Sequence, residues 1–169
     1  MTSTTHQILD KAQILQKIKR IAYEIYENNF DEEEIILAGI WDRGYILATM
    51  IERELIKISS LKVKIVKISL DKFTPTQTDI SLDCETDFLH QKSVIVVDDV
   101  LNSGKTLIYS LKPFLNIEIK KLKIAVLVKR SYRSFPVSAD YVGYSLSTTV
   151  QEHIEVVLED EEKIGAYLF

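Results

Sequence analysis

Two adjacent carboxylates and a turn of small polar residues give this chain its clearest chemical signature. Asp98 and Asp99 end a short run of β-branched residues, and Asn102-Ser-Gly-Lys-Thr106 follows just before a helical pattern. Open α/β sheets bind their ligands where such strands end. Because an ionised carboxylate can only accept hydrogen bonds, two acids beside a phosphate cradle suit a sugar phosphate with free hydroxyl groups.

The turn itself has the properties of a phosphate-binding loop. Gly104 lets the backbone approach a ligand closely, and the first amides of the following helix lack intrahelical partners. Those amides and the positive end of the helix dipole attract an anion, while Ser103, Lys105 and Thr106 add donors. A Walker A loop is excluded, because that motif needs a glycine where this chain has Asp99. An acidic surface turn between a strand and a helix is the alternative.

The segment from Val96 to Thr106 resembles the phosphoribosyl-pyrophosphate (PRPP) signature of type I phosphoribosyltransferases. In that family a hydrophobic strand precedes two acids, two variable residues and a small-residue loop, which is the order found here. The resemblance implies that Asp98 and Asp99 hold the ribose hydroxyls and that residues 102–106 bind the terminal phosphate. It also implies that Mg²⁺ binds through PRPP near the two acids. The expected reaction transfers a 5-phosphoribosyl group from PRPP to a nucleobase and releases pyrophosphate.

A second strand–turn–helix junction lies at residues 38–44, where two glycines bracket a turn. Arg43 in this turn offers a forked set of donors suited to pyrophosphate. The pyrophosphate loop of the family occupies this position, so the resemblance implies that Asp42, Arg43 and Gly44 contact PRPP. Arg43 is accordingly expected to act in catalysis together with the two acids. An ordinary tight turn with an exposed arginine is the alternative.

The polar stretch Asp71–Gln91 has no sustained periodicity and precedes the signature strand. A loop of this length inside one domain is usually functional or mobile. Its position matches the family's flexible catalytic loop, which closes over PRPP. Lys72 and Lys92 are the basic residues available for that role. A disordered acidic surface loop is the alternative.

The segment from Val128 to Gly143 resembles the part of the family that recognises the base. Its overall form is similar to the bifunctional pyrimidine-operon attenuation and uracil phosphoribosyltransferase group, although Lys129 stands where that group has aspartate. A Val-Lys-Arg run with a downstream aromatic and valine also resembles hypoxanthine–guanine phosphoribosyltransferases. The residues implied to contact the base are Lys129, Arg130, Tyr141 and Val142. Uracil is favoured, and a 6-oxopurine is the alternative.

RNA is a further partner that the attenuator group implies. The net charge of −4 gives no general attraction to nucleic acid. The positive charges available for an RNA-binding face are Lys17, Lys19, Arg20, Lys120, Lys121 and Lys123. An enzyme without RNA binding is preferred. A PRPP-sensing RNA-binding attenuator of pyrimidine genes and a PRPP sensor without catalysis are the alternatives.

Alternating helix and strand patterns must position these segments. Helical patterns cover residues 11–29, 45–57 and 106–115, and strand patterns cover 34–40, 63–70, 93–97, 121–128, 141–144, 152–158 and 166–169. This alternation predicts an α/β fold with an open, parallel, twisted sheet flanked by helices. The resemblance adds a small hood formed by chain-terminal segments. We expect one domain over residues 1–169, with a core of about 10–128 and a hood of about 129–169.

Composition limits the remaining possibilities. A chain of 169 residues with 46% hydrophobic and 27% charged residues is ordinary for one globular domain. Its apolar runs are far shorter than the roughly 20 residues that span a bilayer, so no membrane partner is expected. Cys84 is the only cysteine, which excludes an intrachain disulfide and favours the cytoplasm. The resemblance implies a homodimer or homotetramer.

Overall fold

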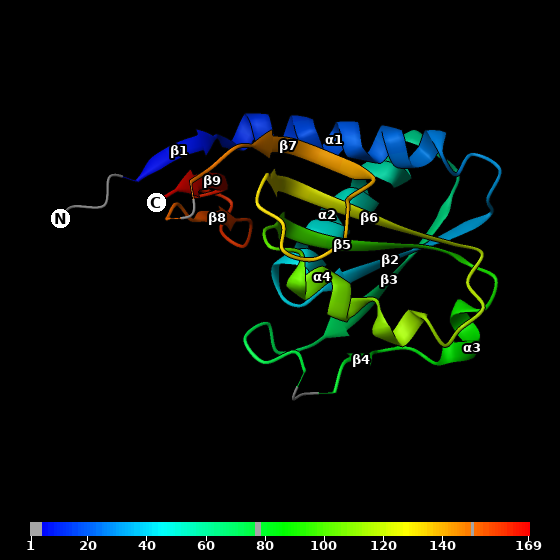
Figure 1. The fold of residues 1–169 in the computed structure, drawn as a ribbon. Coiled ribbons are helices and arrows are strands. Elements are labelled where there is room, and N and C mark those ends of the chain that lie inside the picture. Colours follow the sequence, from blue (N-terminus) through cyan, green and yellow to red (C-terminus); the bar gives the residue numbers. More distant parts are fainter. Residues whose placement is uncertain (1–4, 77–78, 150) are drawn as a thin grey trace.

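A mostly parallel sheet forms the centre of the molecule (Figure 1), which is a computed structural model describing residues 5–76, 79–149 and 151–169. Within these ranges the sheet has six strands in the order β4-β3-β2-β5-β6-β7. Their bounds are β2 Glu34–Ile40, β3 Lys62–Ser69, β4 Ser81–Leu82, β5 Ser93–Leu101, β6 Lys121–Arg130 and β7 Tyr141–Leu146. Neighbouring strands pair in parallel except for β4, which pairs antiparallel with β3. The α/β class predicted from the alternating pattern is therefore confirmed.

Helices cover both faces of this sheet (Figure 1). The longer pair, α1 (Lys11–Glu27) and α2 (Arg43–Ile58), lies on one face. The short elements α3 (Thr86–Leu89), α4 (Lys105–Ser110) and the 3-10 helix η1 (Lys112–Phe114) supply buried residues to the other face. The sheet is thus the middle layer of three, and β5 at its centre is buried on both sides.

The sequence explains these elements directly. Asp10 caps α1 by accepting a hydrogen bond from the Gln13 amide at 2.8 Å, while the Gln13 side chain accepts one from the Asp10 amide. This reciprocal pair satisfies two amides that have no partner within the helix. Alternate residues of β5 point to opposite faces, so Ile95 packs beneath α1 and α2 and Val96 packs toward α4.

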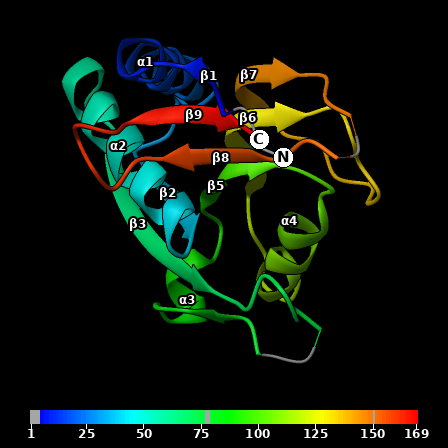
Figure 2. The same cartoon turned by 90° about the vertical axis from the view of Figure 1, so that its left-hand side faces the viewer.

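A second, smaller sheet combines the two ends of the chain. It consists of β1 (His6–Leu9), β9 (Gly165–Leu168) and β8 (Ile154–Val157), all paired antiparallel in the order β1-β9-β8. The sheet lies at the carboxyl end of β5 (Figure 2). The hood expected from residue 129 onward differs from this arrangement, because β7 extends the main sheet and β1 comes from the other end of the chain.

Several element bounds differ from the sequence prediction. Strand β5 continues past Val97 to Leu101, because its parallel pairing with β6 continues as far as Lys129. The helix expected over residues 106–115 ends at Ser110 and gives way to η1, where Pro113 cannot donate a backbone hydrogen bond. The stretch 71–91 contains β4 and α3 instead of a continuous loop. Over the described ranges, no helix has the length and apolar character needed to cross a bilayer.

Candidate active site

The predicted phosphate loop forms a tight turn between β5 and α4. Gly104 caps α4 with φ +90°, a left-handed conformation that glycine adopts without steric penalty. A Cβ atom built on this glycine would lie 2.5 Å from a methyl carbon of Val137, so a side chain has no room there. The amides of Ser134 and Phe135 donate to the Ser103 carbonyl at 2.9 and 3.1 Å. The segment between β6 and β7 therefore holds this loop in place through hydrogen bonds to the Ser103 carbonyl.

A polar cavity of about 210 Å³ opens beside the phosphate loop. Its lining comprises Lys72, Asp98, Val100, Leu101, Asn102, Ser103, Gly104, Lys105, Thr106 and Leu107. The structure thus brings together Asp98 and all five residues of the predicted loop. The cavity lies at the carboxyl end of the central strand β5, where open α/β sheets bind ligands.

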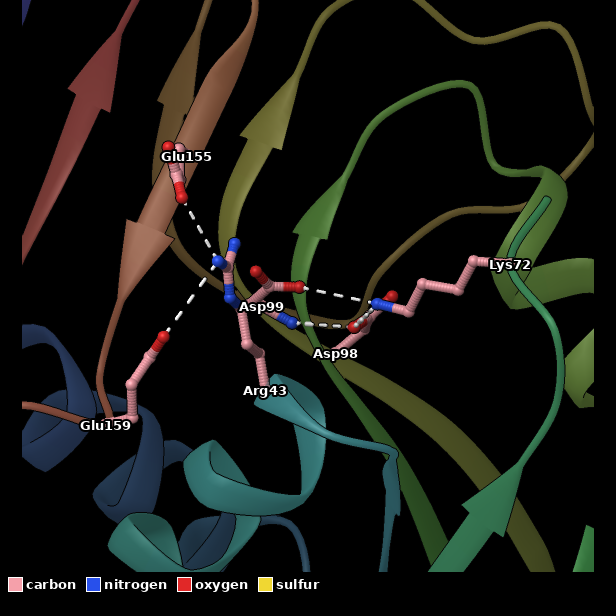
Figure 3. A network of polar contacts seen from close by, with 6 residues as sticks. All are labelled: Arg43, Lys72, Asp98, Asp99, Glu155 and Glu159. Atoms are coloured by element: carbon pink, nitrogen blue, oxygen red, sulfur yellow. Dashed lines mark hydrogen bonds and ion pairs between the residues drawn. The ribbon is translucent and has the colours of Figure 1, made fainter.

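The two acids are buried next to a lysine (Figure 3). Asp98 is 2% and Asp99 6% exposed. The Lys72 Nζ lies 3.3 Å from Asp98 Oδ1 and 3.9 Å from Asp99 Oδ1. Asp98 Oδ1 also accepts a hydrogen bond from the Asp99 amide at 2.9 Å. The only basic residue of the 71–76 segment therefore contacts the acid pair.

Charges in this cluster perturb one another. Burial and the neighbouring charge of Asp99 raise the pKa of the Asp98 carboxyl above its ordinary value, and Lys72 partly offsets this effect. Burial lowers the pKa of the Lys72 ammonium, but the charges of Asp98 and Asp99 outweigh it and the pKa is raised. Such shifts are typical of functional sites.

The acid pair fits a cation, since the Lys72 ammonium already lies against it. Among residues 5–76, 79–149 and 151–169, no three histidine, cysteine or acidic side chains are grouped closely enough to hold a metal ion. A divalent cation at this position therefore needs further oxygen ligands, which a bound pyrophosphate and its sugar hydroxyls can supply. The binding of Mg²⁺ through PRPP stays a prediction.

The predicted pyrophosphate loop lies between β2 and α2, and its Trp41–Asp42 peptide bond is cis. Gly44 packs so closely on β5 that an added Cβ would lie 2.4 Å from the Val97 carbonyl oxygen. The Arg43 guanidinium does not point into open solvent. It lies 3.1 Å from Glu155 Oε1 and 4.0 Å from Glu159 Oε1 (Figure 3).

The four predicted base contacts are not brought together. Tyr141 is 4% exposed and packs in the core beneath α1, which corrects the expectation that it contacts a base. Its neighbour on β6 is Ala125, whereas Lys129 pairs with Ser145 four residues further along β7. Val142 is partly buried against the core on the opposite face of the sheet.

Arg130 also differs from its expected role. It is 5% exposed and donates from Nη1 to Asn102 Oδ1 at 2.8 Å. Its other nitrogens donate to the Thr148 hydroxyl and the Thr149 carbonyl. All three guanidinium nitrogens thus donate to the protein. Of the four candidates, Lys129 and Val142 are half-buried, and Lys129 lies at the strand end.

Sequence reasoning missed Glu155 and Glu159 as partners of Arg43. Glu155 lies on β8, 112 residues further along the chain, so nothing local connects it with the arginine. Its one signal is an acidic residue inside the otherwise apolar strand Ile154–Val157. Such a residue needs either solvent or a cationic partner.

Comparisons with known proteins identify the family of this chain. Residues 4–161 match the phosphoribosyl transferase domain family. The chain is 32% identical to the "Bifunctional protein PyrR" of Macrococcus caseolyticus and 34% identical to that of Staphylococcus aureus. These alignments cover 95% of this chain and 97% and 96% of the two relatives.

Solved structures show the same fold. A hypoxanthine-guanine phosphoribosyltransferase from Bacillus anthracis superposes with a TM-score of 0.73 at 26% identity, covering 97% of this chain and 96% of the other. A hypoxanthine phosphoribosyltransferase of Trypanosoma cruzi has a TM-score of 0.78 at 17% identity, with 96% and 94% covered. On these grounds the chain belongs to the phosphoribosyltransferase family, has the type I fold of that family, and is a pentosyltransferase.

Proposed function

We propose that the chain transfers the 5-phosphoribosyl group of PRPP to uracil and releases pyrophosphate, as a step in nucleotide salvage. The observation that carries this proposal is the cavity at the end of β5, where a buried acid meets a phosphate loop. The choice of uracil rests on similarity over nearly the whole chain to proteins named "Bifunctional protein PyrR" and on the pyrimidine-type form of residues 128–143.

In this proposal the acid pair and the two loops each bind one part of PRPP. The amides and hydroxyls of residues 102–106 hold the terminal phosphate, because these residues line the cavity at the start of α4, where the first amides lack intrahelical partners. Asp98 and Asp99 accept hydrogen bonds from the ribose hydroxyls. Asp42, Arg43 and Gly44 bind the pyrophosphate, for which the guanidinium fork is suited.

The reaction breaks the bond between the anomeric carbon and the pyrophosphate oxygen, and that oxygen keeps the electron pair. A base nitrogen then forms the new bond to carbon and loses its proton. Positive charge develops on the sugar, so the carboxylates of Asp98 and Asp99 favour this state. Asp99, or a water held by it, takes the proton from the base. Asp98 and Asp99 would hold Mg²⁺ together with PRPP, and the ion would supply charge neutralisation at the leaving group.

A 6-oxopurine is the alternative base. Lys129 lies near the end of β6 and offers an ammonium donor to an exocyclic oxygen of the base. The resemblance of the Val-Lys-Arg run to hypoxanthine–guanine phosphoribosyltransferases implies this role for the lysine. One solved neighbour of similar fold carries that name. The burial of Tyr141 weakens this alternative, because the aromatic residue expected to stack on the base lies in the core.

Pyrophosphate release with PRPP and Mg²⁺ tests the assignment, with uracil, hypoxanthine, guanine, xanthine and orotate in separate reactions. Release with uracil alone supports the proposal. Release with an oxopurine alone transfers the assignment to the Lys129 alternative. PRPP binding without release on any base would instead identify a sensor.

RNA binding is a second candidate, because the curated relatives are named as bifunctional. Most of the candidate cations have local partners: Lys120 pairs with Glu32 at 2.7 Å, and Lys123 lies 3.5 Å from Asp140. Filter binding to pyrimidine-operon leader RNA at two salt concentrations tests this function, since phosphate contacts impose a steep salt dependence. A shallow dependence with weak binding supports an enzyme that does not bind RNA.

Assembly and location complete the proposal. A homodimer or homotetramer and a cytoplasmic location stay predictions from the family resemblance and the single cysteine. Sedimentation of the purified chain measures the first. Fractionation of the source cells measures the second.

A further inference from the structure

A buried arginine connects two loops on either side of the β6 end. Arg130 is the last residue of β6 and is 5% exposed. Its Nη1 donates to Asn102 in the phosphate loop at 2.8 Å, and its Nε and Nη2 donate to Thr148 and Thr149 in the segment after β7. Within the described ranges it forms no ion pair with a carboxylate.

The charge of this guanidinium is therefore held by neutral acceptors. Tyr132 adds a cation–π contact, with its ring centroid 5.3 Å from the Arg130 Cζ. Glu152 is near enough for the Arg130 charge to contribute to lowering its pKa, but its carboxylate accepts from the Thr149 amide at 2.5 Å. A buried cation that donates a hydrogen bond from each of its three nitrogens is costly to disturb.

The Asn102 contact matters because of where that residue lies. Asn102 is exposed, lines the cavity and lies in the sequence between the acid pair and Gly104. With its Oδ1 fixed by Arg130, the turn is held from the side, while the amides of Ser134 and Phe135 hold the Ser103 carbonyl from below. One support comes from the last residue of β6 and the other from the segment that follows it.

We propose that Arg130 is a positioning residue for the phosphate loop and not a contact for the base. It fixes Asn102, and with it the direction of the amides of residues 103–106. This role rests on the proposed binding of the PRPP phosphate in the cavity. It assigns the last two residues of β6 different tasks, with Lys129 left as a candidate base contact and Arg130 holding the loop.

The test compares Arg130→Lys, which keeps the positive charge but loses the fork, with Thr148→Val, which loses one acceptor at nearly constant shape. Ser147→Ala, on an exposed neighbour of Thr148, is the matched control. Calorimetric titration with PRPP and Mg²⁺ measures binding, and steady-state kinetics separate kcat from the KM of each substrate. Amide hydrogen exchange at residues 102–106 measures the order of the loop without any ligand.

We expect Arg130→Lys to weaken PRPP binding about tenfold and Thr148→Val about threefold, the scale of one or two hydrogen bonds. The KM for the base stays within about twofold, and exchange at residues 102–106 becomes faster. Ser147→Ala matches the wild-type chain in every measurement.

Unchanged PRPP affinity and unchanged exchange in Arg130→Lys would overturn the inference. A raised KM for the base alone would also overturn it and restore Arg130 as a base contact. If Arg130→Lys does not fold, Thr148→Val decides by the same criteria. Should the wild-type chain bind no PRPP, the proposed function fails, whereas the exchange measurement still decides whether Arg130 holds the loop.

Discussion

Replacing Lys72 with methionine removes the cation that lies between Asp98 and Asp99. The substitution keeps the length and apolar stem of the side chain but leaves the two buried acids without their ammonium partner. We expect the free energy of unfolding to fall, and to fall more at alkaline than at acid pH. The reason is that the attraction between Lys72 and Asp98, the nearer of the two acids, exists only while Asp98 is ionised.

The size of the loss follows from the exposure of the pair. Breaking a fully buried ion pair costs about 3–5 kcal/mol, and a fully exposed pair contributes about 0–1 kcal/mol. The Lys72 side chain is 37% and the Asp98 side chain 3% exposed, so an intermediate loss of about 1–2 kcal/mol is expected after discounting for solvent screening. For a chain of this size that corresponds to a fall in Tm of about 3–6 °C.

The raised pKa values of Asp98 and Lys72 set the direction in which the free energy of unfolding changes with pH. The folded-state pKa of Asp98 is raised, so the folded chain binds more protons than the unfolded chain in the range above the ordinary value of 3.8. Its stability therefore decreases as pH rises through that range. Without Lys72 the pKa of Asp98 rises further, and the decrease extends to higher pH. Lys72 has a raised pKa and stays charged throughout.

Thermal melts of the wild-type chain and Lys72→Met at about pH 4 and about pH 9 measure this effect. Lys64→Met is the matched control, because Lys64 is exposed on β3 and its substitution removes the same charge. The difference in Tm is expected to be small at the lower pH and several degrees at the higher one. In an Asp98→Asn background the effect of Lys72→Met shrinks. Equal Tm values for the Lys72 and Lys64 variants at pH 9 would contradict a stabilising contact between Lys72 and ionised Asp98. A fall in Tm that does not depend on pH would contradict it as well.

Three further substitutions probe the site. Gly104→Ala introduces a Cβ 2.5 Å from Val137 at a φ of +90°, so we expect PRPP affinity to fall about tenfold and stability by about 1–3 kcal/mol, measured by calorimetry and thermal melts. Gly44→Ala places a Cβ 2.4 Å from the Val97 carbonyl oxygen and forces α2 away from β5, so we expect Tm to fall by about 2–10 °C. A Tm within about 1 °C of the wild-type value would contradict this packing. Asp99→Asn is expected to lower pyrophosphate release about a hundredfold or more. Unchanged turnover would remove Asp99 from the mechanism.

Local patterns predicted the framework of the site well. The strand Glu34–Ile40 has the predicted bounds, because a run of apolar residues between an acidic segment and a charged turn is a local signal. The phosphate loop is equally local: its acids, its glycine and the start of α4 lie within nine residues, 98–106. The sheet then places this loop at its carboxyl edge without further information.

Side-chain direction and long-range pairing were not accessible in the same way. Whether Tyr141 faces a ligand or the core depends on the register of β7 against β6, which the sequence of β7 alone does not determine. Arg130 was assigned to the base because it follows Lys129, but successive residues of a strand point to opposite faces. Glu155 contacts Arg43 only after β8 joins the small sheet.

The small sheet also has a consequence for how the protein is made. Its strands β1 and β9 join residues near position 6 to residues near position 168, and β8, which carries the partner of Arg43, pairs with β9. During synthesis the turn after β5 and the segments that support it, up to residue 149, emerge from the ribosome before β9. Contacts this distant in sequence form late. The phosphate loop can thus be complete before β9 is available to pair with β8, so the contact between Arg43 and Glu155 is among the later ones to form.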